Sequence, residues 1–428
     1  MGVLKNATRM LSKEYRKTIF YAITLVFATA ITVIFLEIIN DKNIKVLSLL
    51  DAESVGAIFT DMIGFIIIIF SIIVIIFSNG FYLRRKTKEI SIVSISGYGM
   101  TKTGKYLIVQ NFLIMLLALP FGLGLGYICS PFVSNYIYHT LQITSQHSTF
   151  SISLLVQVVV TIFSIVMIVT LIDAGYVYRN RVVDLLRMKD NTAIVRKGKT
   201  KLPSIIFVIV YFLGVLMLIT SPYDTTGYLV FAGIGSISTV CLLHWYFPEK
   251  ILQIKTIKTV SDKYKMIALG SLENMIQSSK LLIFLMVISV TLLSTQMLTS
   301  YESESSGVVA FIAYIIVIIM LCVSLLYKYM MEAQGQKKQY QMLYVLGYTV
   351  KQLQVIVRKE LFYYYGLLLL LPGIYMVSIL GMSYFHGEAS IGFALTIIGI
   401  YVLALIITAL LCYISYDKQV IKLLKREN

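Results

Sequence analysis

Ten apolar segments, each about as long as a membrane-spanning helix, constrain this chain more than any other feature. A helix needs about 20 mostly apolar residues to cross the hydrocarbon core of a bilayer. Only 14% of the residues are charged, whereas a soluble protein is about one quarter charged. The sequence therefore predicts an all-α integral membrane protein with ten transmembrane helices, at approximately 18–38, 58–80, 106–128, 151–177, 204–221, 227–247, 281–300, 308–327, 361–382 and 391–415.

The positions of the basic residues support this topology. If the N terminus is inside, 35 of the 37 Lys and Arg residues fall in inside segments, and only Lys42 and Lys45 fall outside. Such a bias is what the positive-inside rule requires. We therefore expect both termini to be cytoplasmic. We also expect the net charge of +16 to face lipid headgroups, with no nucleic acid as a partner.

The two halves of the chain carry an internal repeat. Residues 95–98, Ile-Ser-Gly-Tyr, match residues 345–348, Val-Leu-Gly-Tyr, at an offset of 250, and Gln110 falls opposite Glu360. Helices 1–4 and 7–10 then form two equivalent four-helix units of the same orientation, related by an axis along the membrane normal and joined by helices 5 and 6. The expected domains are 1–190, 191–261 and 262–428.

A stretch between the second and third predicted helices fits a phosphate-binding loop at Gly99, Gly104 and Lys105. However, Tyr106 stands where such a loop needs a Ser or Thr to bind Mg²⁺. The second copy of the repeat keeps neither Gly104 nor Lys105. No pair of Cys residues has metal-ligand spacing, and the His residues lie far apart in sequence. The sequence therefore predicts no nucleotide, metal or catalytic site in this chain.

The motifs around the repeat resemble those of the FtsX-like permeases of ABC transporters, the MacB and lipoprotein-release class. The signature of that family, a basic-Lys-Glu-Ile segment followed by a Gly, reads here from Arg84 to Gly97. Gln110 and Glu360 open the third helix of each unit, and residues 182–187 give the closing apolar-x-x-Leu-Leu-Arg motif. Two such units in ten helices are similar to the BceB-type antimicrobial-peptide permeases. Those carry a large extracellular domain where this chain has only residues 301–307.

The resemblance implies the permease subunit of an ABC transporter in a bacterial cytoplasmic membrane. A separate cytoplasmic ATPase, in two copies, would bind ATP and Mg²⁺, and this chain would bind no cofactor. The expected substrate is amphipathic, with a peptide as the leading candidate, in antimicrobial-peptide or bacteriocin immunity or in peptide export. A sensor histidine kinase is a further partner that the resemblance allows. The alternative is an FtsX-like membrane scaffold that passes on a signal without transport.

The resemblance also places ATPase docking in the segments 81–105 and 328–360. Ile90, Val93 and Gly97 share one face of a helix, and Gly97 and Gly347 suit the left-handed turn that ends a helix. The alternative is a basic amphipathic segment lying on anionic lipid. The expected coupling residues are Lys86, Glu89, Ile90, Val93, Gly97, Tyr98, Leu343, Gly347 and Tyr348.

Proline and glycine mark the third and ninth predicted helices. Pro120 and Gly122 lie in one, and Pro372 and Gly373 lie in the other. These four residues are either hinges that let the helices tilt or small residues that let helix backbones approach closely. We expect a hinge because ATP-driven motion of the linkers would tilt these helices.

Few acidic residues lie inside the apolar segments. Glu37, Asp61 and Asp173 each lie near the end of a predicted span. A charge inside a membrane is costly and can mark a substrate or ion path. Positions near the ends instead favour side chains that reach up to the interface, and we expect that arrangement for all three.

Overall fold

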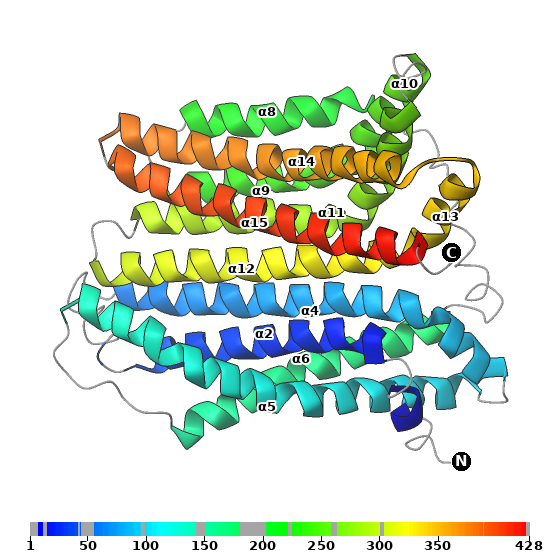
Figure 1. Cartoon of the computed structure of the whole chain (residues 1–428). Helices are drawn as coiled ribbons and strands as arrows, with labels where there is room; N and C mark the ends of the chain where they lie inside the picture. The colour runs from blue at the N-terminus through cyan, green and yellow to red at the C-terminus, as the bar shows by residue number, and fades with distance from the viewer. Residues whose placement is uncertain are drawn as a thin grey trace. The chain divides into compact units, whose positions relative to one another are not determined.

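The computed structural model describes residues 7–11, 15–41, 43, 55–95, 99–142, 151–179, 203–220, 225–257, 263–299, 304–387 and 389–424. Every regular element in these residues is a helix (Figure 1). In chain order the elements are α2 (Tyr15–Asn40), α4 (Val55–Ile95), α5 (Met100–Thr140), α6 (Ile152–Arg179), α8 (Ile205–Thr220), α9 (Thr225–Cys241), the π-helix η1 (Leu242–Tyr246), α10 (Phe247–Ile257), α11 (Lys263–Thr299), α12 (Glu304–Gly335), α13 (Lys337–Val345), α14 (Val350–Phe385) and α15 (Ile391–Leu424).

Eight of the described helices are long and apolar enough to cross a membrane, which confirms eight of the predicted spans. The fifth predicted span corresponds to α8, with 16 residues, and the sixth corresponds to α9 and η1, which follow each other without a break from Thr225 to Tyr246. The total of ten spans and the inside position of the termini stay predictions. The eight segments are Thr18–Asn40, Gly64–Leu83, Thr101–Thr140, Ile152–Tyr176, Lys263–Leu298, Gly307–Met330, Val350–Phe385 and Ile391–Ser415.

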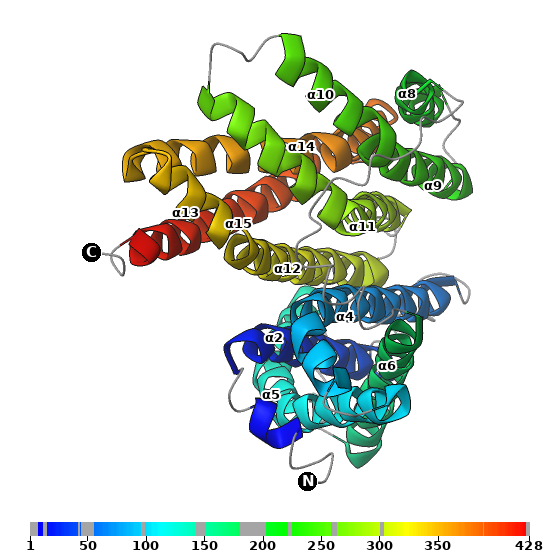
Figure 2. The same cartoon turned by 90° about the vertical axis from the view of Figure 1, so that its right-hand side faces the viewer.

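The chain divides into two compact units, Met1–Lys199 and Thr200–Asn428. In the first unit α2 packs against α4, α5 and α6, and Figure 2 shows these four helices nearly end on. In the second unit α11 packs against α12 and α14, and α15 packs against α12 and α14. Because the first helix of each set contacts the second and third, and the fourth also contacts those two, the packing order supports the internal repeat. The helices α8 and α9 pack on α14 and α11 within the second unit. The predicted limits of three domains stay a prediction.

Two long helices correct the expected loops of the first unit. Both α4 and α5 have 41 residues, which at 1.5 Å per residue gives about 60 Å, twice the hydrocarbon thickness. The expected inside segment 81–105 is therefore not a separate linker, because α4 continues unbroken to Ile95. The third predicted span, 106–128, ends too early, because α5 continues to Thr140.

Polar contacts with α2 explain the extension of α5. The Ser130 hydroxyl donates to the Glu37 carboxylate, and the Tyr138 hydroxyl donates to Asp41 at 2.7 Å. The expectation that Glu37 reaches the interface is therefore wrong, since its side chain is buried and hydrogen-bonded. The polar side chains of this segment suggest a loop in the sequence. In the structure Glu37 and Asp41 accept their hydrogen bonds, and the segment continues the helix α5.

Asp173 lies near the end of its span, as expected, but its side chain points into the unit and does not reach out to an interface. Its carboxylate accepts hydrogen bonds from Asn79 of α4 and from Asn111 of α5, the latter at 2.6 Å. The residue is only 1% exposed. Asp173 therefore ties three helices of the first unit together. The side chain of Asp61 lies outside the described residues.

Close approach between α2 and α5 depends on Gly122. A Cβ atom added there would lie 2.5 Å from Cβ of Thr29 and 3.0 Å from the carbonyl oxygen of Val26, and one added at Gly126 would lie 2.7 Å from Cβ of Val33. At Gly124 a Cβ would meet nothing within 4 Å. Gly122 and Gly126 thus form a small-residue stripe of the kind that lets helix backbones meet in a membrane. This contact supports the packing interpretation of Gly122.

In the second unit, neighbouring helices satisfy the backbone around Pro372. Proline has no N–H, so the carbonyl of Leu368 loses its helical partner. The Tyr401 hydroxyl of α15 donates to that carbonyl at 2.7 Å. The Tyr211 hydroxyl of α8 donates to the carbonyl of Leu371 at 2.6 Å. These two bonds hold α8 and α15 against the part of α14 that surrounds Pro372.

Tyr375 fixes the same region of α14 against the α8–α9 pair. Its hydroxyl donates to the carbonyl of Tyr211 at 2.9 Å. A Cβ at Gly214 would overlap this hydroxyl, and a Cβ at Gly235 would overlap the hydroxyl and the ring. A Cβ at Gly373 would meet nothing within 4 Å. The hinge role of Pro120, Gly122, Pro372 and Gly373 stays a prediction.

Gly122→Ala tests the packing at the α2–α5 contact. The added methyl group overlaps Thr29, and overpacking a tight contact costs about 1–3 kcal/mol. We expect a lower midpoint of thermal unfolding for the protein in detergent. The matched variant Gly124→Ala, on the same helix but in open space, should unfold at or above the wild-type temperature. Equal midpoints for the two variants would contradict the close approach.

Candidate coupling site

A buried lysine joins α4 to α5 in the first unit. Lys86 is fully buried, and its Nζ donates to Oε1 of Gln110 at 2.8 Å. The same Nζ lies 3.6 Å from Oε2 of Glu89 and 4.7 Å from the centre of the Tyr82 ring. A buried ammonium needs such partners, because an uncompensated charge in a low-dielectric interior is very costly.

Glu89 completes the cluster from the same face of α4. Its Oε1 accepts from the hydroxyl of Tyr106 and from Nε2 of Gln110, the latter at 3.1 Å. The amide of Gln110 thus accepts from the cation and donates to the anion, which fixes its orientation. Because Gln110 and Tyr106 lie on α5, these bonds hold the start of that helix against the end of α4.

Most of the described residues that the sequence predicted for ATPase coupling in the first unit therefore point into the protein. Ile90 is fully buried and packs with the cluster that includes Leu83 and Tyr106, and Val93 is half-buried. Ile92, which the sequence analysis did not select, is 56% exposed instead. Gly97 and Tyr98 lie outside the described residues. Lys86, Glu89 and Ile90 are placed to position α4 and not to contact a partner directly.

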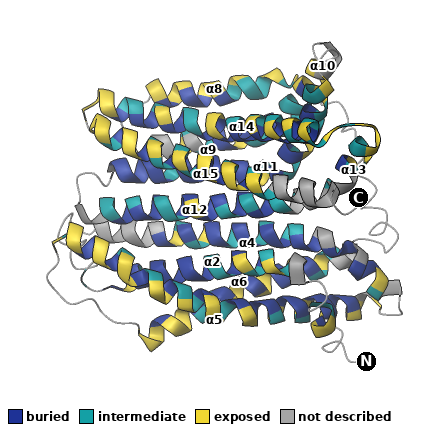
Figure 3. Cartoon of the chain, in the orientation of Figure 1, coloured by how far each residue is buried: buried dark blue, intermediate teal, exposed yellow. Residues whose placement is uncertain are grey.

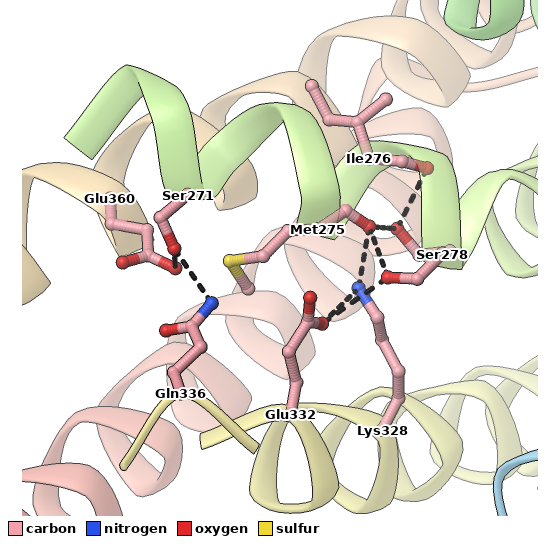
Figure 4. Close-up of polar contacts among 9 residues, drawn as sticks. Ser271, Met275, Ile276, Ser278, Lys328, Glu332, Gln336 and Glu360 are labelled. Atoms are coloured by element: carbon pink, nitrogen blue, oxygen red, sulfur yellow. Dashed lines mark hydrogen bonds and ion pairs between the residues drawn. The ribbon is translucent and has the colours of Figure 1, made fainter. Parts of the chain in front are cut away.

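A second buried cation occupies the corresponding end of the second unit (Figure 4). The Nζ of Lys328 on α12 donates to the carbonyl of Met275 on α11 at 2.7 Å and lies 3.2 Å from Oε2 of Glu332. It also lies 4.8 Å from the centre of the Tyr364 ring. Sequence reasoning missed this residue because the repeat offset pairs it with a serine, Ser78. The sequence did carry a signal for this site: Lys328 ends an apolar run, and Glu332 follows four residues later, where the two side chains can pair on a helix.

Glu360, the counterpart of Gln110, connects three helices of the second unit. Its Oε1 accepts from Ser271 of α11 at 2.7 Å, and its Oε2 accepts from the hydroxyl of Tyr340 on α13 at 3.2 Å. Gln336 donates to the Ser271 hydroxyl at 2.8 Å, as Figure 4 shows. The short helix α13 is therefore attached at its base to α11 and α14.

A sharply defined corner joins α13 to α14. Gly347 has φ +94°, which confirms the left-handed turn expected there. The N–H of Gly347 donates to Tyr344 and the N–H of Tyr348 donates to Leu343 at 3.1 Å, the bond pattern of a Schellman motif. Thr349 then begins α14 with a capping box. The two caps leave the corner little conformational freedom.

Apolar side chains project from this corner. Met342 is 70% exposed, Val345 83% and Leu346 74%, whereas Leu343 and Tyr348 are half-buried. In the repeat, Met342 corresponds to Ile92, an exposed apolar residue near the end of α4. An apolar cluster presented on a rigid corner is typical of a protein-binding surface.

The variant Lys86→Met tests the buried cluster. It leaves the Glu89 carboxylate buried without its cation, and breaking a buried pair in this way costs about 3–5 kcal/mol. We expect a large loss of stability in denaturant or thermal unfolding in detergent. The double variant Lys86→Met with Glu89→Gln removes both charges and should recover most of that loss. A single variant as stable as the wild type would show that the pair does not hold α4 to α5.

Comparison with known proteins gives a family match for the first unit. Residues 62–178, which contain the Lys86 cluster, match the family model of the FtsX-like permease C-terminal region. The chain is also 21% identical over 224 residues to the bacitracin export permease protein BceB of Bacillus subtilis (strain 168). That match covers 52% of this chain and 34% of the relative, so the chain spans about a third of the length of the relative. The family match supports an FtsX-like permease, and the matched residues lie within the four-helix first unit.

Proposed function

We propose that this chain is the permease subunit of an ABC transporter and that a separate cytoplasmic ATPase docks on its helical corners. The α13–α14 corner carries this proposal. Its exposed residues Met342, Val345 and Leu346 form an apolar surface, and both helix ends are capped. A partner that pushes on such a rigid surface moves the attached helices and does not merely deform a loop.

The hydrogen bonds beneath the corner give the path of that motion. Tyr340 lies on α13, and its hydroxyl bonds to Glu360 on α14. Glu360 in turn bonds to Ser271 on α11. Movement of α13 would therefore pull on the two helices that pack most closely in the second unit. In the first unit the Lys86–Gln110 bond makes the equivalent connection between α4 and α5.

The repeat supports two copies of the ATPase. Each unit presents one exposed apolar residue at the equivalent position, Ile92 or Met342. ATP and Mg²⁺ would bind to the ATPase and not to this chain. A sensor histidine kinase is a further candidate partner, and the bacterial cytoplasmic membrane is the proposed location.

An amphipathic peptide is the proposed substrate class. The name of the similar B. subtilis protein refers to the export of bacitracin. The spans α5, α6, α14 and α15 expose many large apolar side chains (Figure 3), so a substrate that partitions into the bilayer could approach the chain from the membrane. The proposed physiological roles are immunity to antimicrobial peptides or bacteriocins, and peptide export.

A pull-down of the tagged chain from its native membrane in mild detergent tests the ATPase partnership. We expect a co-purifying ATPase and ATP hydrolysis by the eluate. The variant Met342→Asp places a charge in the proposed apolar contact and should reduce both at least tenfold, the effect of about 1.4 kcal/mol.

The control for this experiment is Phe385→Asp. Phe385 is 82% exposed at the opposite end of α14, so the same change there should leave the ATPase bound. Retention of the ATPase by Met342→Asp, or its loss in both variants, would place the docking surface elsewhere.

Peptide sensitivity tests the substrate. Deletion of the coding sequence should make the native strain more sensitive to at least one amphipathic peptide antibiotic, and the wild-type chain should restore growth. Restoration by Met342→Asp would show that protection does not need the docked ATPase. An ATPase that binds while no peptide sensitivity or export changes would favour the FtsX-like scaffold over the transporter.

A further inference from the structure

An open apolar groove runs between α14 and α15 in the second unit. Its volume is about 530 Å³, and its lining includes Phe362, Gly366, Leu369 and Leu410. Phe362 is 75% exposed and Leu410 56%, and Figure 3 shows exposed positions along both helices. Both helices are candidate membrane spans, so the groove has the composition expected of a surface that contacts acyl chains.

The groove is cationic at one end. Arg358 lines it there, with its guanidinium 3.4 Å from the Tyr413 hydroxyl and 5.8 Å from the centre of the Tyr413 ring. Lys351 lies two helical turns before Arg358 on the same face of α14 and is also exposed. The polarity along this face of α14 therefore changes from basic at the start of the span to apolar farther along.

The first unit lacks both features at equivalent positions. With the repeat offset, Ile108 stands opposite Arg358, and Leu116 stands opposite Gly366. Leu116 is 55% exposed on α5. At these two aligned positions, the cation and the glycine occur in the second unit alone, although the two units share the same packing order. An ordinary lipid-facing surface would not require this difference.

We propose that this groove binds one anionic phospholipid, with its phosphate at Arg358 and an acyl chain along the notch at Gly366. Charge complementarity selects this occupant, because Arg358 lies at the end of the span that the sequence predicts to be cytoplasmic, and a basic pocket between membrane helices there favours anionic headgroups. Arginine suits the phosphate because its planar guanidinium donates two parallel hydrogen bonds. The apolar walls beyond it fit a hydrocarbon chain. This inference does not depend on the proposed transport function.

Native mass spectrometry of the delipidated full chain in detergent tests the proposal. Dioleoylphosphatidylglycerol and dioleoylphosphatidylcholine are added separately at equal concentrations, and the bound fraction is measured for each. We expect the wild type to retain the anionic lipid preferentially. Arg358→Gln should weaken retention of the anionic lipid about fivefold, the effect expected of one basic residue near a membrane surface.

A second variant tests the groove itself. Gly366→Leu copies Leu116 and fills the notch, and its Cβ would meet no protein atom within 4 Å, so the fold should tolerate it. We expect this variant to lose the anionic lipid as well. The matched controls are Gly399→Leu, an equally open glycine of α15 outside the groove, and Lys105→Gln, which removes one exposed positive charge from α5.

Both controls should bind the anionic lipid as the wild type does. Equal retention of the two lipids by the wild type would overturn the proposal. So would wild-type binding by Gly366→Leu, or an equal loss in Lys105→Gln and Arg358→Gln.

Discussion

A buried polar side chain about three turns into the third helix of each unit ties neighbouring helices together. Gln110 in the first unit bonds to both Lys86 and Glu89 of the preceding helix. Glu360 in the second bonds to Ser271 and to Tyr340. Leaving such groups unpaired in an interior would cost far more than an ordinary hydrogen bond provides. These bonds hold α4 to α5 in the first unit, and they hold α14 to α11 and α13 in the second.

This constraint makes mechanical coupling physically reasonable. A docking surface can transmit the motion of a bound ATPase only if the surface is rigid and attached to the helices that must move. The α13–α14 corner has both properties, because Gly347 and Thr349 cap its two helix ends and Tyr340 attaches its base. In the first unit, Lys86 and Glu89 can lie buried in a mostly apolar protein because each has a partner within the unit.

Features that depend only on neighbouring residues, such as apolar spans and tight turns, could be predicted from the sequence. Apolar runs predicted eight spans that the structure contains, and Gly347 predicted a left-handed turn because only glycine adopts it without strain. The inward orientation of Lys86 was not predictable in that way, because its partner Gln110 is 24 residues away on another helix. Likewise, the polar Ser130 favours a loop when the sequence is taken alone. In the structure it lies within a helix because Glu37 of α2 accepts its hydrogen bond. Hydrogen bonds between side chains of different helices depend on how the helices pack, so no short stretch of the sequence predicts them.

Photo-crosslinking from Leu346 in native membranes is the most direct test of the central claim. Leu346 is 74% exposed beside the Gly347 turn, so a photoreactive residue there should form an adduct with an ATP-binding protein. The same residue placed at Phe385 lies about 50 Å away along α14 and should not form that adduct. A Leu346 adduct with the ATPase, absent from Phe385, is the predicted result. No protein adduct from Leu346, or the same adducts from both positions, would contradict the assignment of this corner as the coupling surface.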